Sequence, residues 1–264
     1  MRGAVIPVLV LALWQGLAAG GVFNPEVLPA PLAVAVRWWA YLTPDQPFDP
    51  TRDGFLSWLL SGEMVGDAAA SLYRVLVGFA IGAGLALPLG LAMGASRLAF
   101  EVFNPLVQVL RPIPPIAYIP LAILWFGLGN PPAIFLISIG AFFPVLMNTI
   151  AGVQTVDGIY IRAARNLGAG PVTLFLRVML PAAMPYILAG ARIGVGTAFI
   201  VVIVSEMIAV NSGLGYRILE AREYFWSDKI IAGMLTIGLI GLAIDSFMTR
   251  LSDVLLVWHR GPDS

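Results

Sequence analysis

Six long apolar runs dominate this sequence and restrict what it can fold into. A helix needs about 20 mostly apolar residues to cross a membrane, and lipid admits only helices and closed barrels. The runs are too long and too continuous for the alternating strands of a barrel. We therefore predict an all-α polytopic membrane protein with about six transmembrane helices. The predicted spans are Ala4–Gly20, Ala69–Met93, Leu106–Phe126, Ala133–Val153, Met184–Ala209 and Ile230–Val254.

Composition narrows the function classes. The chain is 59% hydrophobic and 11% charged, whereas globular proteins average about 45–50% and 25%. It has no cysteine, which excludes disulfides, thiol catalysis and thiolate metal sites. A net charge of zero without a basic stripe argues against nucleic acid as a partner. Because no Gly-Lys-Ser/Thr loop occurs, we expect no ATP hydrolysis and no cofactor on this chain.

The first apolar run allows two interpretations. Arg2, a short apolar core and the small residues Ala18, Ala19 and Gly20 are also typical of a cleaved signal peptide. We favour a retained span over residues 1–20 and keep cleavage as the alternative.

Basic residues beside the spans predict the orientation, because cytoplasmic flanks carry an excess of Lys and Arg. With both termini in the cytoplasm, eight basic residues lie inside and five outside. The inner set is Arg2, Arg97, Arg111, Arg162, Arg165, Arg177, Arg250 and Arg260, and the outer set is Arg37, Arg52, Arg217, Arg222 and Lys229. This topology places residues 21–68 outside, a transmembrane core at 69–254 and a cytoplasmic tail at 255–264.

The predicted external segments contain helix and turn signals. Residues 28–31, Leu-Pro-Ala-Pro, introduce a short Trp-rich helix over 37–41 that suits a membrane interface. Residues 43–53 form a proline-rich insert to which we assign no role. Residues 210–229 form a second external loop.

The connection 155–181 carries the most local information. Asp157 is a good N-cap for a short helix, and Gly168 supplies the positive φ that ends one. Pro171 fits the first position of a second helix, which we expect to stop near Leu180 and Pro181, where the next span begins.

The first helix of this connection is amphipathic. Ile161, Ala164 and Leu167 share an apolar stripe, while Arg162 and Arg165 are i,i+3 neighbours. Such a helix can dock in the groove of a partner or lie on lipid headgroups, and the spacing favours neither.

The same connection resembles the coupling motif of ATP-binding-cassette importer permeases. Ala163-Ala164-x-x-x-Gly168 is followed, after nine residues, by Val178-x-Leu180-Pro181, and the family motif reads Glu-Ala-Ala, three residues, Gly, nine residues, Ile-x-Leu-Pro. Over residues 20–260 the chain is similar to the nitrate/sulfonate/taurine/bicarbonate branch. The supporting stretches are Leu28–Pro31, Ser71–Gly78, Arg111–Pro115, Ala191–Gly194, Ser205–Met207, Ser212–Gly215 and Val257–Arg260.

The resemblance implies a type I importer permease fold and a set of partners. These are a second permease copy, with a homodimer expected or a paralogue as the alternative, two cytosolic ATPases carrying ATP and Mg, and an external solute-binding protein, all at a bacterial inner membrane. The implied ATPase-coupling residues are Asp157, Arg162, Ala163, Ala164, Arg165, Leu167, Gly168, Leu180 and Pro181. Arg162 stands where the motif has Glu, which puts the family's salt bridge to the ATPase in doubt but not the docking helix.

Four ionisable residues fall inside the predicted spans, where each costs about 2.5–3.5 kcal/mol at a helix centre and should find a partner. Residues at similar depth in the membrane are expected to pair. Arg74 and Glu206, which Met207 follows, both lie near the outer ends of their spans, and Arg192 and Asp245 both lie in the inner third. Each pair either belongs to a gate or anion pathway or only holds helices together. A charge swap would distinguish the two roles.

Prolines crowd the third and fourth spans and predict kinks there. They are Pro112, Pro114, Pro115, Pro120, Pro131, Pro132 and Pro144. We expect spans two to five to form the translocation core of an importer permease for a small anion. A sulfonate or taurine is favoured, while nitrate, bicarbonate, an aromatic acid or a vitamin precursor are alternatives. A secondary transporter or channel is the rival function, but paired broken helices in two repeated halves are not visible. An intramembrane enzyme lacks a catalytic set.

Overall fold

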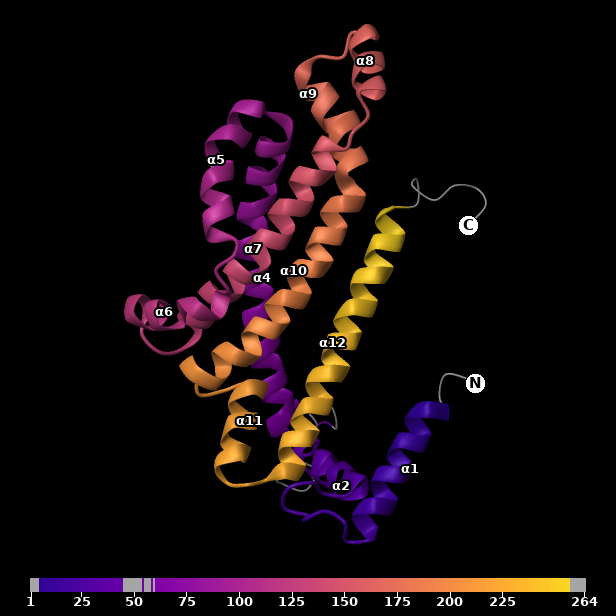
Figure 1. Cartoon of the computed structure of the whole chain (residues 1–264), viewed down its shortest axis with the longest axis vertical. Coiled ribbons are helices and arrows are strands. Elements are labelled where there is room, and N and C mark those ends of the chain that lie inside the picture. Colours follow the sequence, from indigo (N-terminus) through magenta and orange to yellow (C-terminus); the bar gives the residue numbers. More distant parts are fainter. Residues whose placement is uncertain (1–4, 45–53, 55–57, 59, 257–264) are drawn as a thin grey trace. The chain divides into compact units, whose positions relative to one another are not determined.

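The computed structural model describes residues 5–44, 54, 58 and 60–256, and its regular elements are helices (Figure 1). No strand occurs within those residues, which agrees with the predicted all-α fold. The elements are α1 Val5–Ala19, α2 Pro31–Leu42, α4 Glu63–Ala95, α5 Arg97–Leu110, η2 Pro115–Tyr118, α6 Ile119–Phe126, α7 Asn130–Gln154, α8 Gly158–Asn166, α9 Pro171–Leu174, the π-helix η3 Phe175–Met179, α10 Leu180–Ala209, α11 Leu214–Glu223 and α12 Ser227–Leu255.

The six predicted spans take three forms among the described residues. Four are single helices that are long and apolar enough to cross a membrane: α4, α7, the continuous stretch Pro171–Ala209 and α12. The first is α1, an apolar helix of 15 residues, which at about 1.5 Å per residue is shorter than the bilayer core. The third is a bent pair of helices.

The predicted third span, Leu106–Phe126, is wrong as a single helix. Helix α5 begins at Arg97, and the helices Arg97–Leu110 and Pro115–Phe126 are bent by 81°. Proline lacks an N–H and disfavours helical backbone at the residue before it, so Pro112 and Pro114 end α5. Pro144, by contrast, is accommodated inside the continuous helix α7.

The chain divides into two compact units, and residues 74–205 with 241–264 form the larger. Here glycines let α4 pack closely on α7. The closeness is clear at Gly82, where a Cβ atom would lie 2.4 Å from the carbonyl oxygen of Ser138. Buried apolar side chains such as Met93, Leu146 and Ile150 fill the remaining contact. The core of this unit therefore sits between its long helices.

The smaller unit comprises residues 1–73 and 206–240. The predicted Trp-rich interfacial helix is present as α2, with Pro31 in its first turn. The predicted second loop, 210–229, contains the ten-residue helix α11. Within this unit Trp38 Nε1 donates to Thr236 Oγ1 at 2.9 Å and ties α2 to α12. The insert 43–53 falls mainly on residues outside those described.

Candidate functional site

The first half of the 155–181 connection folds as its local signals predict. Asp157 Oδ1 accepts a hydrogen bond from Ile159 N at 2.8 Å and caps α8. At the other end Gly168 has φ +81°, its amide donates to Arg165 O, and Ala169 N donates to Ala164 O. These bonds satisfy carbonyls that would be left without partners at the end of the helix.

The second half of the connection differs from the prediction. Pro171 begins α9 as expected, but the helix does not stop near Leu180 and Pro181. It passes through the π-helix η3 directly into α10. A π segment shifts the hydrogen-bond pattern by one residue, which lets the helix axis continue toward Pro181, a residue without an N–H to donate.

The α8 surface of the connection is unusually apolar for an exposed segment. Ile159, Tyr160 and Leu167 have exposed fractions of 60%, 64% and 88%. Ile161 and Ala164, which were predicted to share an apolar stripe with Leu167, are half-buried. Leu167 is exposed and therefore does not share their packed face. Figure 1 shows α8 and α9 beyond the ends of α7 and α10, where a partner could reach them.

Charged residues lie beside these apolar side chains. Arg162, Ala163 and Arg165 are all exposed on α8. The Arg162 guanidinium lies over Gly158, because a Cβ at that glycine would be 3.1 Å from Arg162 Nη1. Arg162, which stands where the coupling motif has Glu, is thus an exposed cation on the surface of this connection.

A second polar site surrounds the start of α11. The first amides of this helix bond to three side chains: Gly213 N to Asp67 Oδ1 at 2.9 Å, Leu214 N to Ser71 Oγ at 3.0 Å, and Gly215 N to Glu206 Oε2 at 2.9 Å. Ser71 Oγ also donates to Glu206 Oε2 at 2.9 Å. A helix N-terminus carries partial positive charge, so it stabilises two buried carboxylates. Hereafter we call Asp67, Ser71 and Glu206 the acidic cradle.

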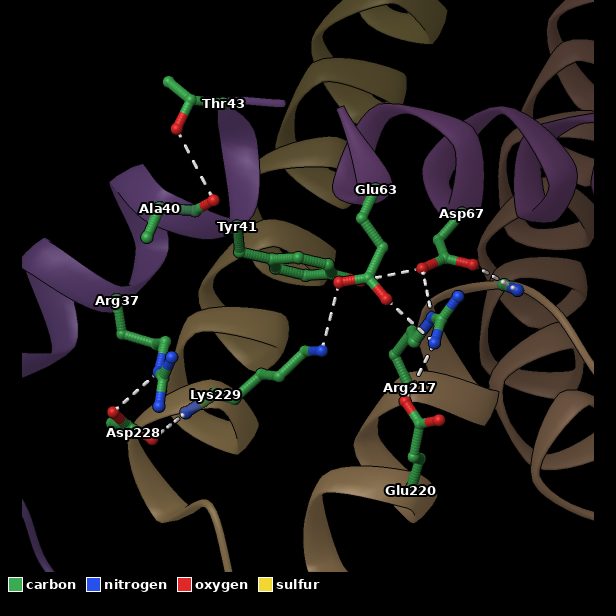
Figure 2. A network of polar contacts seen from close by, with 11 residues as sticks. Arg37, Ala40, Tyr41, Thr43, Glu63, Asp67, Arg217, Glu220, Asp228 and Lys229 are labelled. Carbon is green, nitrogen blue, oxygen red and sulfur yellow. Dashed lines mark hydrogen bonds and ion pairs between the residues drawn. The ribbon is translucent and has the colours of Figure 1, made fainter. Parts of the chain in front are cut away.

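Arg217 ties the acidic cradle to neighbouring helices (Figure 2). Its guanidinium bonds to Asp67 at 2.8 Å, to Glu63 at 2.8 Å and to Glu220 at 2.9 Å. Partial burial disfavours the charged guanidinium, but these carboxylates outweigh it and raise the pKa of Arg217 above its usual range. The cation is therefore a fixed charge in this network.

Tyr41 closes the network from α2. Its hydroxyl donates to Asp67 Oδ2 at 3.0 Å, and Lys229 Nζ lies 5.0 Å from its ring centre (Figure 2). Burial, together with the Asp67 carboxylate, raises the pKa of the Tyr41 phenol well above its ordinary value. The phenol thus stays protonated and keeps donating to Asp67.

Arg74 and Glu206, which were predicted to pair inside the membrane, are both buried and both have polar partners. Arg74 is 2% exposed and its Nε donates to Asn130 Oδ1 at 2.7 Å, whereas Glu206 accepts the bonds of the acidic cradle. Met207 is half-buried beside it. The pairing of Arg74 with Glu206 stays a prediction.

Arg192 and Asp245 are brought together. Two parallel bonds of 2.7 Å join Arg192 Nε and Nη2 to the two carboxylate oxygens of Asp245. Their side chains are 46% and 52% exposed, and they line a cavity of about 230 Å³ between α10 and α12. The geometry fits a helix-to-helix tie, and a role in transport stays a prediction.

Sequence reasoning missed three residues. Asp67 and Arg217 were placed in external segments, although they join helices 150 positions apart in the chain. Arg111 was counted as a cytoplasmic flank, but it follows α5 at the bend of the broken span. The Pro-Ile-Pro-Pro run after Arg111, from which a kink in the third span was predicted, is where the 81° bend lies. Among the described residues no cluster of metal-ligating side chains occurs.

Comparison with known proteins decides the family. Residues 84–256 match the family described as binding-protein-dependent transport system inner membrane component. This chain belongs to that family. The permease is also similar to the SsuC protein of Bacillus subtilis, named for aliphatic sulfonates transport, with 36% identity over 98% of this chain and 88% of that protein.

A further relative supports the assignment, and a solved structure shows the fold. The taurine transport system permease protein TauC of Escherichia coli is 33% identical over 95% of the permease and 87% of its own length. A solved structure of the MetNI methionine ABC transporter in an inward-facing conformation matches with a TM-score of 0.63 at 19% identity. That match covers 70% of the permease and 92% of the matched chain. The permease therefore has the fold of an ABC importer membrane subunit.

Proposed function

We propose that this permease carries a small sulfonate, such as taurine or an alkanesulfonate, through an ATP-driven importer. The names of SsuC and TauC support this substrate class. The family description names an inner membrane component, and the flanking basic residues favour both termini in the cytoplasm.

The assembly that supports such transport has four further protein subunits besides this chain. A second copy of the permease completes the pathway, two cytosolic ATPases bind ATP and Mg, and an external solute-binding protein delivers the substrate. ATP binding closes the ATPases and moves the 155–181 connection, which shifts the pathway between two conformations that each bind their partners differently.

The observation that carries the coupling role is the exposed apolar tip of the connection. Ile159, Tyr160 and Leu167 protrude beside the cationic residues Arg162 and Arg165. Exposed apolar groups rimmed by polar residues mark an interaction site. We infer that they enter a groove on the ATPase, with Arg162 facing a carboxylate there instead of the basic residue that a motif Glu would meet.

Two glycines of the connection provide a matched test. Gly168 has φ +81°, whereas Gly170 has φ −72° and open space around its Cβ position. A β-branched residue is strained only at the first. Gly168→Val should leave the permease in the membrane but lower substrate-stimulated ATP turnover and uptake at least tenfold, while Gly170→Val behaves like the unsubstituted permease. Normal stimulated turnover in Gly168→Val would overturn the coupling assignment.

A second variant separates docking on the ATPase from binding to lipid headgroups. Leu167→Asp removes the most exposed apolar group without disturbing the packed side of α8. Loss of ATPase co-purification in mild detergent is the expected result. Unchanged co-purification would favour the headgroup interpretation of α8.

A further inference from the structure

The break in the third span leaves a cation in the larger unit that no group among the described residues neutralises. Arg111 is exposed, its backbone amide donates to Val107 O at 2.9 Å, and within the described part of the chain its guanidinium has no hydrogen bond or ion pair. Ionisable residues inside a membrane normally face a partner or a water-filled cavity. Arg111 is therefore available to a charged group other than the side chains that the structure describes.

A pocket lies directly beside Arg111. It has a volume of about 400 Å³, which is within the size range of small-molecule sites. Helices α7 and α10 form its walls with the break as its rim, and its lining includes Arg111, Pro115, Gly140, Pro144, Asn148 and Thr197. Backbone that leaves the helix at membrane depth is tolerated where it lines such a cavity.

The pocket lies at the middle of two spans. Gly140 and Pro144 are central in the 25 residues of α7, and Thr197 is central in the 30 residues of α10. Arg111 follows the 14 residues of α5, which place it about 21 Å along that helix from its start. The pocket therefore lies along the middle of these two long helices and not at their ends.

The polar groups of the pocket suit an oxyanion. A guanidinium presents several N–H donors in one plane, which match two oxygens of an anion. Asn148 Nδ2 uses one hydrogen on Pro144 O at 2.8 Å, and an amide carries two. Thr197 Oγ1 donates to Ile193 O at 3.0 Å, so it does not donate to the anion, but its lone pairs can accept a hydrogen bond from an amino group such as that of taurine.

Other carboxylates of the long helices are already engaged. Glu101 accepts from Arg97, Glu206 accepts from Ser71, and Asp245 accepts from Arg192. A second copy of the chain that used one of these three carboxylates to neutralise Arg111 would therefore have to break an existing bond. An anionic solute requires no such exchange.

We propose that Arg111, with Asn148, forms an anion-binding subsite on the transport pathway, and that Thr197 accepts from the amino group of a solute that carries one. The inference deepens the proposed function and rests on it for the sulfonate class. It assigns Arg111 the role of holding the oxyanion group of the solute while the pathway changes conformation.

Transport by the reconstituted complex tests the subsite. The permease, its ATPases and its binding protein are placed in proteoliposomes, and uptake of taurine and ethanesulfonate is measured per assembled complex. Arg111→Gln should lower uptake at least tenfold while ATP turnover stimulated by the loaded binding protein stays within twofold. Arg111→Lys should retain an intermediate rate. Arg97→Gln, on the same helix and already paired, is the matched control and should stay within twofold of the unsubstituted complex.

The outcomes that overturn the subsite are distinct. Uptake by Arg111→Gln within twofold of the unsubstituted complex would overturn it, as would equal losses in the Gln and Lys variants. Failure of the unsubstituted complex to take up either sulfonate would count against the proposed function instead.

A chemical measurement tests the site without transport. Phenylglyoxal modification of the purified complex is followed at each arginine by mass spectrometry, with ethanesulfonate, sulfate, nitrate or choline present. The anions should slow modification of Arg111 at least threefold without affecting Arg97, and choline should not. Equal rates at Arg111 with and without anions would overturn the subsite even if Arg111→Gln fails to assemble.

Discussion

Gly213→Ala should destabilise the smaller unit strongly, because this glycine meets two constraints at once. Its φ of 106° and ψ of 168° lie in a region that is essentially restricted to glycine. A Cβ there would lie 2.4 Å from the carboxyl carbon and one carboxylate oxygen of Glu206, which is fully buried. The methyl group therefore has to displace part of the acidic cradle.

The magnitude follows from these two effects. The backbone strain costs about 1–3 kcal/mol, and loss of the charge-assisted bond between Gly215 N and Glu206 costs about 1.5–3 kcal/mol. We expect a destabilisation of about 4 kcal/mol from the two together. The effect should concentrate at the start of α11, where the three capping bonds meet.

Unfolding of the purified permease by increasing SDS fraction in mild detergent, read by tryptophan fluorescence, measures the loss. Hydrogen exchange should show faster exchange of the first α11 amides. The control is Gly66→Ala in α4 of the same unit, since nothing lies within 4 Å of a Cβ there. Alanine in a helix is favoured by about 0.5–1 kcal/mol, so this control should be neutral or stabilising. If Gly213→Ala unfolds within about 1 kcal/mol of the control, this explanation of the cradle is wrong.

Of three further predictions, two use the same unfolding assay and one is read by assembly and uptake. Gly82→Ala should destabilise the larger unit by several kcal/mol, because its Cβ would clash with the α7 backbone. Gly84→Ala should be neutral, since open space surrounds that position. Equal unfolding midpoints for the two variants would contradict this prediction. Reversing the charge of Arg192 or of Asp245 alone should impair assembly and uptake. If the pair is structural, reversing both charges together should restore assembly and uptake. Restored assembly without uptake would show a role in the pathway. The raised pKa of the Tyr41 phenol means that its contribution to the free energy of unfolding is constant below about pH 10 and falls above that pH, where only the unfolded state loses the proton. Tyr41→Phe should lack this alkaline decline. Parallel curves of stability against pH for both proteins would argue against the assignment.

Features that depend on neighbours in the chain were predictable. The cap at Asp157, the positive φ at Gly168 and the start of α9 at Pro171 follow from residue types a few positions apart. The four long spans follow from apolar runs alone. Hydropathy failed at Leu106–Phe126, because a window average does not register that closely spaced prolines turn one span into two helices bent by 81°.

The sequence by itself determined that this chain is helical, lies in a membrane and carries a capped, amphipathic connection. Only the tertiary structure decided which polar groups meet. Asp67 and Arg217 are 150 positions apart, yet they share one network. Local patterns report the free energy of forming a helix, whereas the partner of a buried charge depends on which helices pack together. For the same reason Arg111 reads as a flanking residue in the sequence and lines a pocket in the fold.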